Sequence, residues 1–399
     1  MQNSINRREF IKSSSRVIAA GALLANLPGI ALGAVSDDRL MRHRFGLNYV
    51  PSQNWYFCWN DWKPDDIAHD FDRIAAVGAD HIRIMLIWPW FQPNPTFVSP
   101  VHLDRLEELM RLAAERKLDV LVTIFTGFLS GYHFSPPYLE GEPFFTSPKW
   151  STVQSVFLTE VSKRLVHHPN FLGYDVSNEI DCNWLCSLKD GDIWMEAIFK
   201  QMRDLCPGCI CVNGVDHRVW FNETSFTPQA LMAEQEIVAL HCWPFWTGAG
   251  KYGGHLDVPY THLPAAMAAL ARSYGKSANA PIWIEEFGAC SAEMPEADVP
   301  KWMEKAVTSS VQEGVSWFTW WASHDVDRRF EFNNFEYTLG LMTVDNQIKD
   351  QGRMFKELAD TYRGQPVTIP SAPSTSPPAQ RTDEATWKWM LDWMKGKAT

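Results

Sequence analysis

The chain has 399 residues and a formal net charge of −11 at pH 7, and 13% of its residues are aromatic. Such an acidic surface argues against a nucleic acid as partner, whereas neutral sugars are compatible with it. The aromatic side chains, 19 tryptophans among them, fill a large core or stack on the apolar faces of sugar rings.

The N-terminal segment is typical of an export signal. Arg7 and Arg8 precede an apolar run, residues 17–32, which ends at small residues, 31–34. These features are typical of a twin-arginine signal peptide, and an ordinary amphipathic helix is the alternative. We expect the twin-arginine export machinery to act on residues 1–34 and the mature protein to be periplasmic or secreted. The apolar run is too short and too rich in glycine for a permanent membrane span.

From residue 46 onward, short apolar runs typical of strands alternate with amphipathic runs typical of helices. The expected strands are 46–50, 81–87, 119–125, 172–176, 210–213, 237–241, 282–285 and 316–321. The expected helices are 64–77, 102–116, 153–167, 193–205, 228–234, 264–274, 299–313 and 353–362. This alternation predicts one (β/α)8 TIM barrel over residues 41–364. A doubly wound open sheet is the alternative, but no Gly-x-Gly-x-x-Gly turn follows the first strand.

The composition changes after Gly364, and we treat residues 365–399 as a separate extension. Residues 366–380 are rich in proline and serine, as in a linker. The sequence that follows places apolar side chains on one helical stripe: Trp387, Met390, Leu391 and Met394. We expect a short helix that docks on the barrel; a helix that binds a partner or a membrane surface is the alternative.

The cysteines do not point to a metal or a redox centre. Cys206 and Cys209 form a Cys-x-x-Cys pair, but the thioredoxin-like context of a redox motif is missing. Cys182 and Cys186 only loosely resemble the second pair that a zinc site would need. We expect buried thiols with at most one disulfide after export, and no metal and no cofactor. A redox or metal enzyme is a distant alternative.

Two carboxyl groups stand where expected strands end, which is the edge of a barrel that carries active sites. Glu179 follows Asn178 after the fourth strand, and Glu286 ends the seventh. Hydrolysis of a glycosidic bond needs two carboxyl groups on opposite sides of the bond. We therefore predict a glycosidase that uses Glu179 and Glu286 as its two carboxyl groups, while Asn178 holds the sugar 2-hydroxyl. Arg83, on the inward face of the second strand, is expected to keep Glu286 ionised.

Taken singly, each of these residues has an ordinary explanation, as a helix cap or a salt-bridge partner. Their joint occurrence at one edge of the barrel carries the prediction. His241 and Trp243 end the sixth strand, and Trp320 ends the eighth. We expect these three side chains to bind the substrate.

With these residues the sequence resembles glycoside hydrolase family 5, a family of retaining barrels, over roughly residues 45–345. The resemblance implies that Asn178-Glu179 carries the acid/base and that Glu286, before Phe-Gly, is the nucleophile. Because neighbouring strand residues face opposite sides, Glu285 is expected to point away from the site. The family's tryptophan after strand eight corresponds to Trp320.

Many members of the family carry His-x-Tyr after strand six, whereas this chain has His241-Cys242-Trp243. The indole N–H of Trp243 is expected to replace the tyrosine hydroxyl beside the nucleophile. Several stretches also resemble the exo-acting β-mannosidases of subfamily eighteen: 46–52, 80–84, 88–94, 241–246 and 320–325. The resemblance implies release of β-linked mannose from short oligosaccharides, and Trp88 is included among the expected binding residues.

The expected loops after strands three and eight, 126–150 and 322–345, are long. Long loops usually carry function, and walls of this kind favour a pocket for the end of a sugar chain. We expect His324 and Asp325 to bind the hydroxyls of the terminal sugar, with His133 as a further candidate. An endo-β-mannanase or β-glucanase with an open cleft, and a sugar-binding protein without catalysis, are the alternatives.

Overall fold

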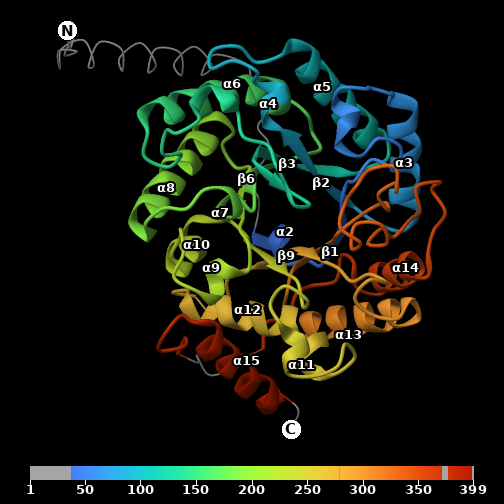
Figure 1. Cartoon of the computed structure of the whole chain (residues 1–399). Helices are drawn as coiled ribbons and strands as arrows, with labels where there is room; N and C mark the ends of the chain where they lie inside the picture. Colours follow the sequence, from blue (N-terminus) through green and yellow to red (C-terminus); the bar gives the residue numbers. More distant parts are fainter. Residues whose placement is uncertain (1–36, 278, 371–375, 398–399) are drawn as a thin grey trace.

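The computed structural model describes residues 37–277, 279–370 and 376–397, so the expected signal peptide lies outside the described residues. Eight parallel strands form one sheet in the order β7-β6-β3-β2-β1-β10-β9-β8. The strands are β1 (Arg44–Asn48), β2 (His81–Ile87), β3 (Asp119–Thr126), β6 (Phe171–Asn178), β7 (Ile210–Gly214), β8 (Val238–Cys242), β9 (Ile282–Phe287) and β10 (Trp317–Trp320), with a separate hairpin of β4 (Phe128–Leu129) and β5 (Tyr132–His133). The sheet curls into a nearly closed barrel inside a ring of helices (Figure 1), which confirms the predicted (β/α)8 fold.

The helices lie outside the strands, and four of the longer ones begin with a side chain that caps the first turn. The longer ones are α3 (Pro64–Ala76), α5 (Pro100–Glu115), α6 (Pro148–Leu165), α8 (Leu188–Leu205), α10 (Pro228–Glu234), α12 (Leu263–Tyr274), α13 (Val299–Gln312), α14 (Asp350–Tyr362) and α15 (Asp383–Lys397). The short ones are α2 (Asp37–Leu40), η1 (Trp55–Trp59), α4 (Trp88–Phe91), η2 (Pro137–Leu139), α7 (Ile180–Asn183), α9 (Arg218–Phe221), η3 (Ala249–Lys251), α11 (Val258–Thr261) and η4 (Glu296–Asp298). Ser147 caps α6 ahead of Pro148, so that helix begins five residues before its expected start at 153.

The core has two parts, because successive strand residues face opposite sides of the sheet. The outward side chains pack against the helices in one large cluster. The inward side chains near the amino ends of the strands form a smaller apolar cluster, which includes Leu121, Leu172, Ile210, Val212, Ala239, Trp283 and Trp317. The barrel is therefore filled with side chains, and its carboxyl end holds a cluster of buried polar side chains.

Side chains complete the barrel between β7 and β8, where the described strands share no backbone register. The carboxamide oxygen of Gln235 accepts hydrogen bonds from the N–H groups of Asn213 in β7, at 3.0 Å, and Ala239 in β8, at 3.4 Å. Glu236 accepts a further bond from the N–H of Cys211 at 2.7 Å. Backbone groups that a neighbouring strand would pair are thus satisfied by side chains.

Aromatic rings join three loops on one side of the barrel mouth. The ring of Trp55, in the loop after β1, lies 5.7 Å from Tyr132 of the hairpin and 4.7 Å from Phe332 of the loop after β10. Tyr132 and Phe332 are themselves 4.9 Å apart. We call this set of three rings the aromatic wall.

Helix α15 packs against α12 and α11 at the outside of the barrel (Figure 1). Trp387, Met390 and Met394 are buried in this contact. The indole N–H of Trp387 donates to the carbonyl oxygen of Thr247, in the loop after β8, at 2.8 Å. In the described part of the chain, none of the helices has the length and apolar character needed to cross a bilayer.

All eight cysteines lie within the described residues and are free thiols, and six of them are buried. The sulfur atoms of Cys209 and Cys211 are 3.9 Å apart in a buried region beside β7.

Candidate active site

Arg83 is the centre of a polar cluster inside the barrel mouth, and its side chain is fully buried. Nη1 donates to Oε1 of Glu286 at 2.7 Å and to the amide oxygen of Asn48 at 3.0 Å. Nε and Nη2 donate to Oδ2 of Asp175 at 3.0 and 2.7 Å, and Nη2 also reaches the amide oxygen of Asn178 at 2.9 Å. One guanidinium group, from β2, therefore holds side chains from three other strands, β1, β6 and β9, in place.

Glu286, at the end of β9, has donors on both carboxylate oxygens. Arg83 contacts Oε1, while the indole N–H of Trp243 donates to Oε2 at 3.3 Å. Nδ1 of His241 also lies 3.3 Å from Oε2. Burial raises the pKa of Glu286 to about 7, while His241 and Arg83 favour the charged form and Glu179 opposes it.

Glu179 follows β6 in a left-handed backbone conformation, with φ 43° and ψ 52°. Its N–H donates to the carbonyl oxygen of Gly214 at 2.7 Å, which fixes this turn. A residue with a side chain rarely adopts this conformation, and such strain is often stored at functional sites. The turn brings Oε1 of Glu179 to 2.9 Å from Nδ1 of His241.

Glu179, His241 and Glu286 form a compact group in which one polar atom of each lies within 4.8 Å of the others. Carboxyl groups about 5 Å apart are typical of retaining glycosidases, whereas inverting enzymes hold them at roughly 6.5–9.5 Å. Burial alone would lower the pKa of His241, but Glu286, Glu179 and Glu285 raise it well above its ordinary value. The same atoms could ligate a metal ion, but Arg83 and a protonated His241 already supply positive charge there.

Glu285, which we expected to point away, faces the barrel interior, so that expectation was wrong. Trp283 belongs to the inward cluster, and alternation along β9 places Glu285 on the same side. The register of β9 against β8 then shifts between Leu240 and His241, so that Glu286 also turns inward. The Glu285 carboxylate lies 3.3 Å from Nε of Arg83 and 3.4 Å from Nε2 of His241.

Gly214 leaves room for this packing of side chains. A Cβ atom at this position would lie 2.7 Å from the Glu285 carboxylate and 2.8 Å from Nη2 of Arg83. The cluster therefore needs a glycine at the end of β7.

Asp175 is part of the cluster although sequence reasoning did not single it out. Burial and the charge of Glu285 raise its pKa to about 6, against the opposing effect of Arg83. The hydroxyl of Thr123 donates to it at 2.8 Å, and the N–H of Gly214 donates at 2.9 Å. The signal that could have revealed it is an acidic residue within an apolar strand.

Trp88 does not reach the site, contrary to expectation. It is fully buried under the loops, and its indole N–H donates to Gln92 at 2.7 Å. Its ring stacks on Phe157 of α6 at 6.1 Å and lies 5.3 Å from Trp150. Trp88 is therefore a core residue.

Trp320 is likewise a core residue, because it lies on the outward face of β10. Its ring packs against Phe287 at 5.2 Å and against Trp302 of α13 at 6.0 Å. The next residue, Trp321, takes the inward side, and its indole N–H donates to Oε2 of Glu336 at 3.4 Å. Trp321, and not Trp320, is therefore the tryptophan at this strand end that faces the barrel mouth.

His324 and Asp325 hold the loop after β10 in place, so they are not free to bind sugar hydroxyls as we expected. Nδ1 of His324 contacts the carbonyl oxygen of Val50 at 3.1 Å, and Nε2 contacts the amide oxygen of Asn346 at 3.0 Å. Asp325 accepts bonds from Lys349 at 2.8 and 3.1 Å. Both side chains are occupied by protein partners.

His133 lies at the exposed end of the β4–β5 hairpin. Its Nδ1 contacts the amide of Asn183 at the end of α7, and its ring lies 5.4 Å from Phe128. It therefore borders the turn that carries Glu179.

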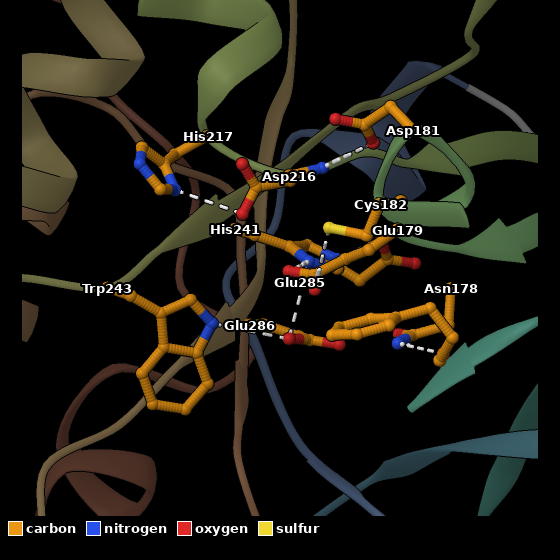
Figure 2. Close-up of polar contacts among 12 residues, drawn as sticks. Asn178, Glu179, Asp181, Cys182, Asp216, His217, His241, Trp243, Glu285 and Glu286 are labelled. Atoms are coloured by element: carbon orange, nitrogen blue, oxygen red, sulfur yellow. Dashed lines mark hydrogen bonds and ion pairs between the residues drawn. The ribbon is translucent and has the colours of Figure 1, made fainter. Parts of the chain in front are cut away.

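A second polar group lies beside Glu179, away from Glu286 (Figure 2). The thiol of Cys182 is 3.9 Å from Oε2 of Glu179, and Nη2 of Arg218 is 3.0 Å from that sulfur. Burial and the charge of Asp216 raise the pKa of Asp181 to about 7. Although burial opposes it, His217 and Arg218 lower the pKa of Asp216. Sequence reasoning missed this group.

The family model for cellulases, described as glycosyl hydrolase family 5, matches residues 44–325. A GH5_18 variant from Streptomyces cattleya, solved in complex with Manβ1-4GlcNAc, is 28% identical, with a TM-score of 0.81 over 89% of this chain and 92% of that chain. GH5_18 from Bifidobacterium longum subsp. longum ATCC 55813 is 27% identical, with a TM-score of 0.83 over 90% of each chain.

An exo-β-1,4-mannosidase from Opitutaceae bacterium strain TAV5 shares the fold, at 22% identity and a TM-score of 0.73 over 83% of this chain and 61% of that chain. No curated protein matches the chain significantly.

Proposed function

Since the chain belongs to glycosyl hydrolase family 5, we propose that it is a retaining exo-β-mannosidase that releases mannose from the ends of short β-linked oligosaccharides. The observation that carries the proposal is the pair Glu179 and Glu286, whose carboxylates approach within 4.8 Å at the barrel mouth. The similarity to GH5_18 proteins, one of them in complex with Manβ1-4GlcNAc, supports mannose as the sugar.

In the first step, an oxygen of Glu286 attacks the anomeric carbon and the bond to the leaving oxygen breaks. Glu179 donates its proton to that oxygen, and a covalent glycosyl-enzyme remains. Arg83 and Trp243 hold Glu286 by hydrogen bonds to opposite carboxylate oxygens, so the nucleophile is oriented before substrate arrives.

In the second step, Glu179 takes a proton from water, and the water oxygen attacks the anomeric carbon. The bond to Glu286 breaks, and the sugar leaves with the configuration that it had in the substrate. His241 lies between the two carboxylates and, as a cation, stabilises the one that carries negative charge at each stage.

Two observations support attack at a chain end. The aromatic wall closes one side of the mouth by joining three loops. The carboxylate residues themselves are nearly enclosed, since Glu286 is 4% exposed and Glu179 is 9% exposed. An enzyme that cleaves within a long chain needs an open groove through which the chain can pass.

The test uses aryl β-mannoside, β-glucoside and β-galactoside, followed by a β-mannooligosaccharide labelled at its reducing end. We expect the mannoside to be the best substrate and NMR to show the β-anomer as the first product. The labelled chain should shorten by one unit at a time. Several labelled lengths at the earliest times would show endo action and contradict the proposal.

We also propose that the precursor is exported by the twin-arginine route, because Arg7 and Arg8 precede an apolar run, residues 17–32, that ends at small residues. Cell fractionation of the wild-type chain and of an Arg7→Lys, Arg8→Lys variant tests this proposal. The activity should leave the cytoplasm only with the wild-type chain, and equal export of both would contradict it.

A further inference from the structure

Glu336 is a buried carboxylate at the barrel mouth that the proposed mechanism does not use. It lies in the loop after β10 and is 8% exposed. Its carbonyl oxygen accepts a hydrogen bond from the N–H of Val326 at 3.1 Å, and this bond joins two segments of the same loop. The inward-facing Trp321 donates its indole N–H to Oε2 at 3.4 Å. Both its backbone and its side chain are therefore held in place.

Glu336 differs from the three glutamates around Arg83 and His241 because it lacks a cation. Glu179, Glu285 and Glu286 each have a nitrogen of Arg83 or His241 within 3.4 Å. Within residues 37–277, 279–370 and 376–397, Glu336 forms no ion pair with a Lys, Arg or His. A buried carboxylate without a cation is costly, so its presence at a substrate entrance points to use.

The charges of both proposed catalytic carboxylates affect the pKa of Glu336. Burial raises its pKa to about 7, Ser130 and Trp321 favour its charged form, and the charges of Glu286 and Glu179 oppose it. The geometry agrees: Trp321, which holds the Glu336 carboxylate, donates its own backbone N–H to the carbonyl oxygen of Phe287 at 2.9 Å, directly after Glu286.

Ser130, in the loop after β3, lies close to Glu336. It lies in the turn of the β4–β5 hairpin with φ 52°, a conformation that costs energy for a residue with a side chain. Its buried hydroxyl lies beside the Glu336 carboxylate. The loops after β3 and β10 thus meet at a hydroxyl and a carboxylate next to the aromatic wall.

We propose that Glu336 binds the terminal sugar of the substrate by accepting hydrogen bonds from hydroxyls remote from the bond that is cleaved. A carboxylate offers two oxygens, which match two neighbouring hydroxyls, and bonds to a charged acceptor are stronger than neutral ones. A sugar unit attached at those hydroxyls would remove the donors, so Glu336 selects the end of a chain. This assignment rests on the proposed glycosidase function.

The test compares the wild-type protein with Glu336→Gln on an aryl β-glycoside and on its 3-, 4- and 6-deoxy analogues. The series is built on whichever sugar the wild-type protein cleaves, so a wrong choice of mannose leaves the test intact. The wild-type protein should lose about 10- to 150-fold in kcat/KM when the recognised hydroxyl is removed. In Glu336→Gln, kcat/KM on the parent sugar should fall by a similar factor. Removal of the recognised hydroxyl from the substrate should then lower kcat/KM of the variant little further.

Glu331→Gln is the matched control, because Glu331 lies in the same loop with an exposed side chain. It should keep the wild-type pattern across the whole series. Thermal unfolding checks that Glu336→Gln, which keeps the shape of the side chain, remains folded. If Glu336→Gln lowers kcat/KM by the same factor on the parent sugar and on every analogue, its role is structural and the proposal is overturned.

Discussion

The interior of this barrel has two layers built by the same strands. Toward the amino ends lie apolar side chains such as Leu121 and Trp283, and the indole N–H of Trp283 donates to the neutral hydroxyl of Thr319 at 2.7 Å. Toward the carboxyl ends, Arg83, Glu285 and His241 are just as completely buried, but they are held by charge. Burial stabilises the lower layer, whereas each charge in the upper layer costs free energy that pairing only partly returns. The lower layer supports the fold and the upper layer is kept for chemistry.

The largest expected effect separates the two adjacent glutamates of the upper layer. Glu286→Ala should lower kcat/KM by at least about 10⁴-fold, because the nucleophile is lost. Azide, a small anion, should restore turnover of an aryl glycoside by attacking from the vacated side, and NMR should show the α-glycosyl azide. Glu285→Ala is the control, and an α-azide from that variant would reverse the assignment.

The second prediction compares the stability lost when a buried charge is removed with the stability lost when a buried apolar side chain is removed. Arg83→Met should cost about 3–5 kcal/mol of unfolding free energy, because it leaves buried carboxylates without their cation. Leu121→Ala, in the lower layer, should cost about 2–5 kcal/mol through the cavity that it creates.

The pH dependence distinguishes the two losses, and chemical denaturation at pH 5 and pH 8 measures both. Glu286 and Asp175, with pKa values of about 7 and 6, bind protons at pH 5 and no longer need the cation. The Arg83→Met loss should therefore be larger at pH 8, and that of Leu121→Ala should be equal at both pH values. A pH-independent loss in Arg83→Met would contradict the charge argument.

The third prediction concerns stability in the wild-type protein. The pKa of Glu286 is raised to about 7 in the folded state, so its contribution to stability is complete below its ordinary pKa and is lost as pH rises through 7. Glu286→Gln removes this loss and should unfold a few degrees above the wild-type protein at pH 8, but not at pH 4. Differential scanning calorimetry measures the shift, and a lower Tm for the variant at pH 8 would rule out this origin.

The smallest expected effect comes from a substitution outside the barrel, at Trp387 of α15, that disturbs the upper layer through a chain of hydrogen bonds. Trp387 of α15 holds the carbonyl of Thr247, and the Thr247 hydroxyl in turn donates to the carbonyl of Trp243 at 2.9 Å. Trp387→Phe should therefore lower kcat by a few-fold, because the hydrogen bond from Trp243 to Glu286 becomes less well oriented. Trp389→Phe, on a more exposed face of α15, is the control, and equal effects of both variants would exclude this path.

The barrel and Arg83 could be predicted from strand periodicity, and the two catalytic candidates from their places at strand ends. Arg83 faces inward between two outward isoleucines, and Glu179 and Glu286 end apolar strands. That Glu285 and Glu286 both face inward could not be predicted, because the register shift that turns Glu286 inward depends on how β8 and β9 pair. A strand read in isolation does not contain that information.

The loop residues failed for a different reason. His324 and Asp325 have the chemistry of sugar ligands, but Asn346 and Lys349, which occupy them, are brought close only by the folded loop. Trp320 and Trp321 are one residue apart, so a small error in the strand start exchanges their faces. Glu336 was missed because a long loop without periodicity gives no indication of which side chains turn inward.

Between the described strands β7 and β8 the barrel is joined by the side chain of Gln235 and not by a backbone ladder. A closed ring of backbone ladders has no preferred point of opening, whereas this ring is joined at one place by a single carboxamide and a neighbouring carboxylate. Opening there breaks fewer backbone bonds than opening between any other pair of strands. Amide hydrogen exchange should therefore be fastest, among the inner strands, at Asn213 and Ala239, and new chain ends introduced between β7 and β8 should be tolerated best.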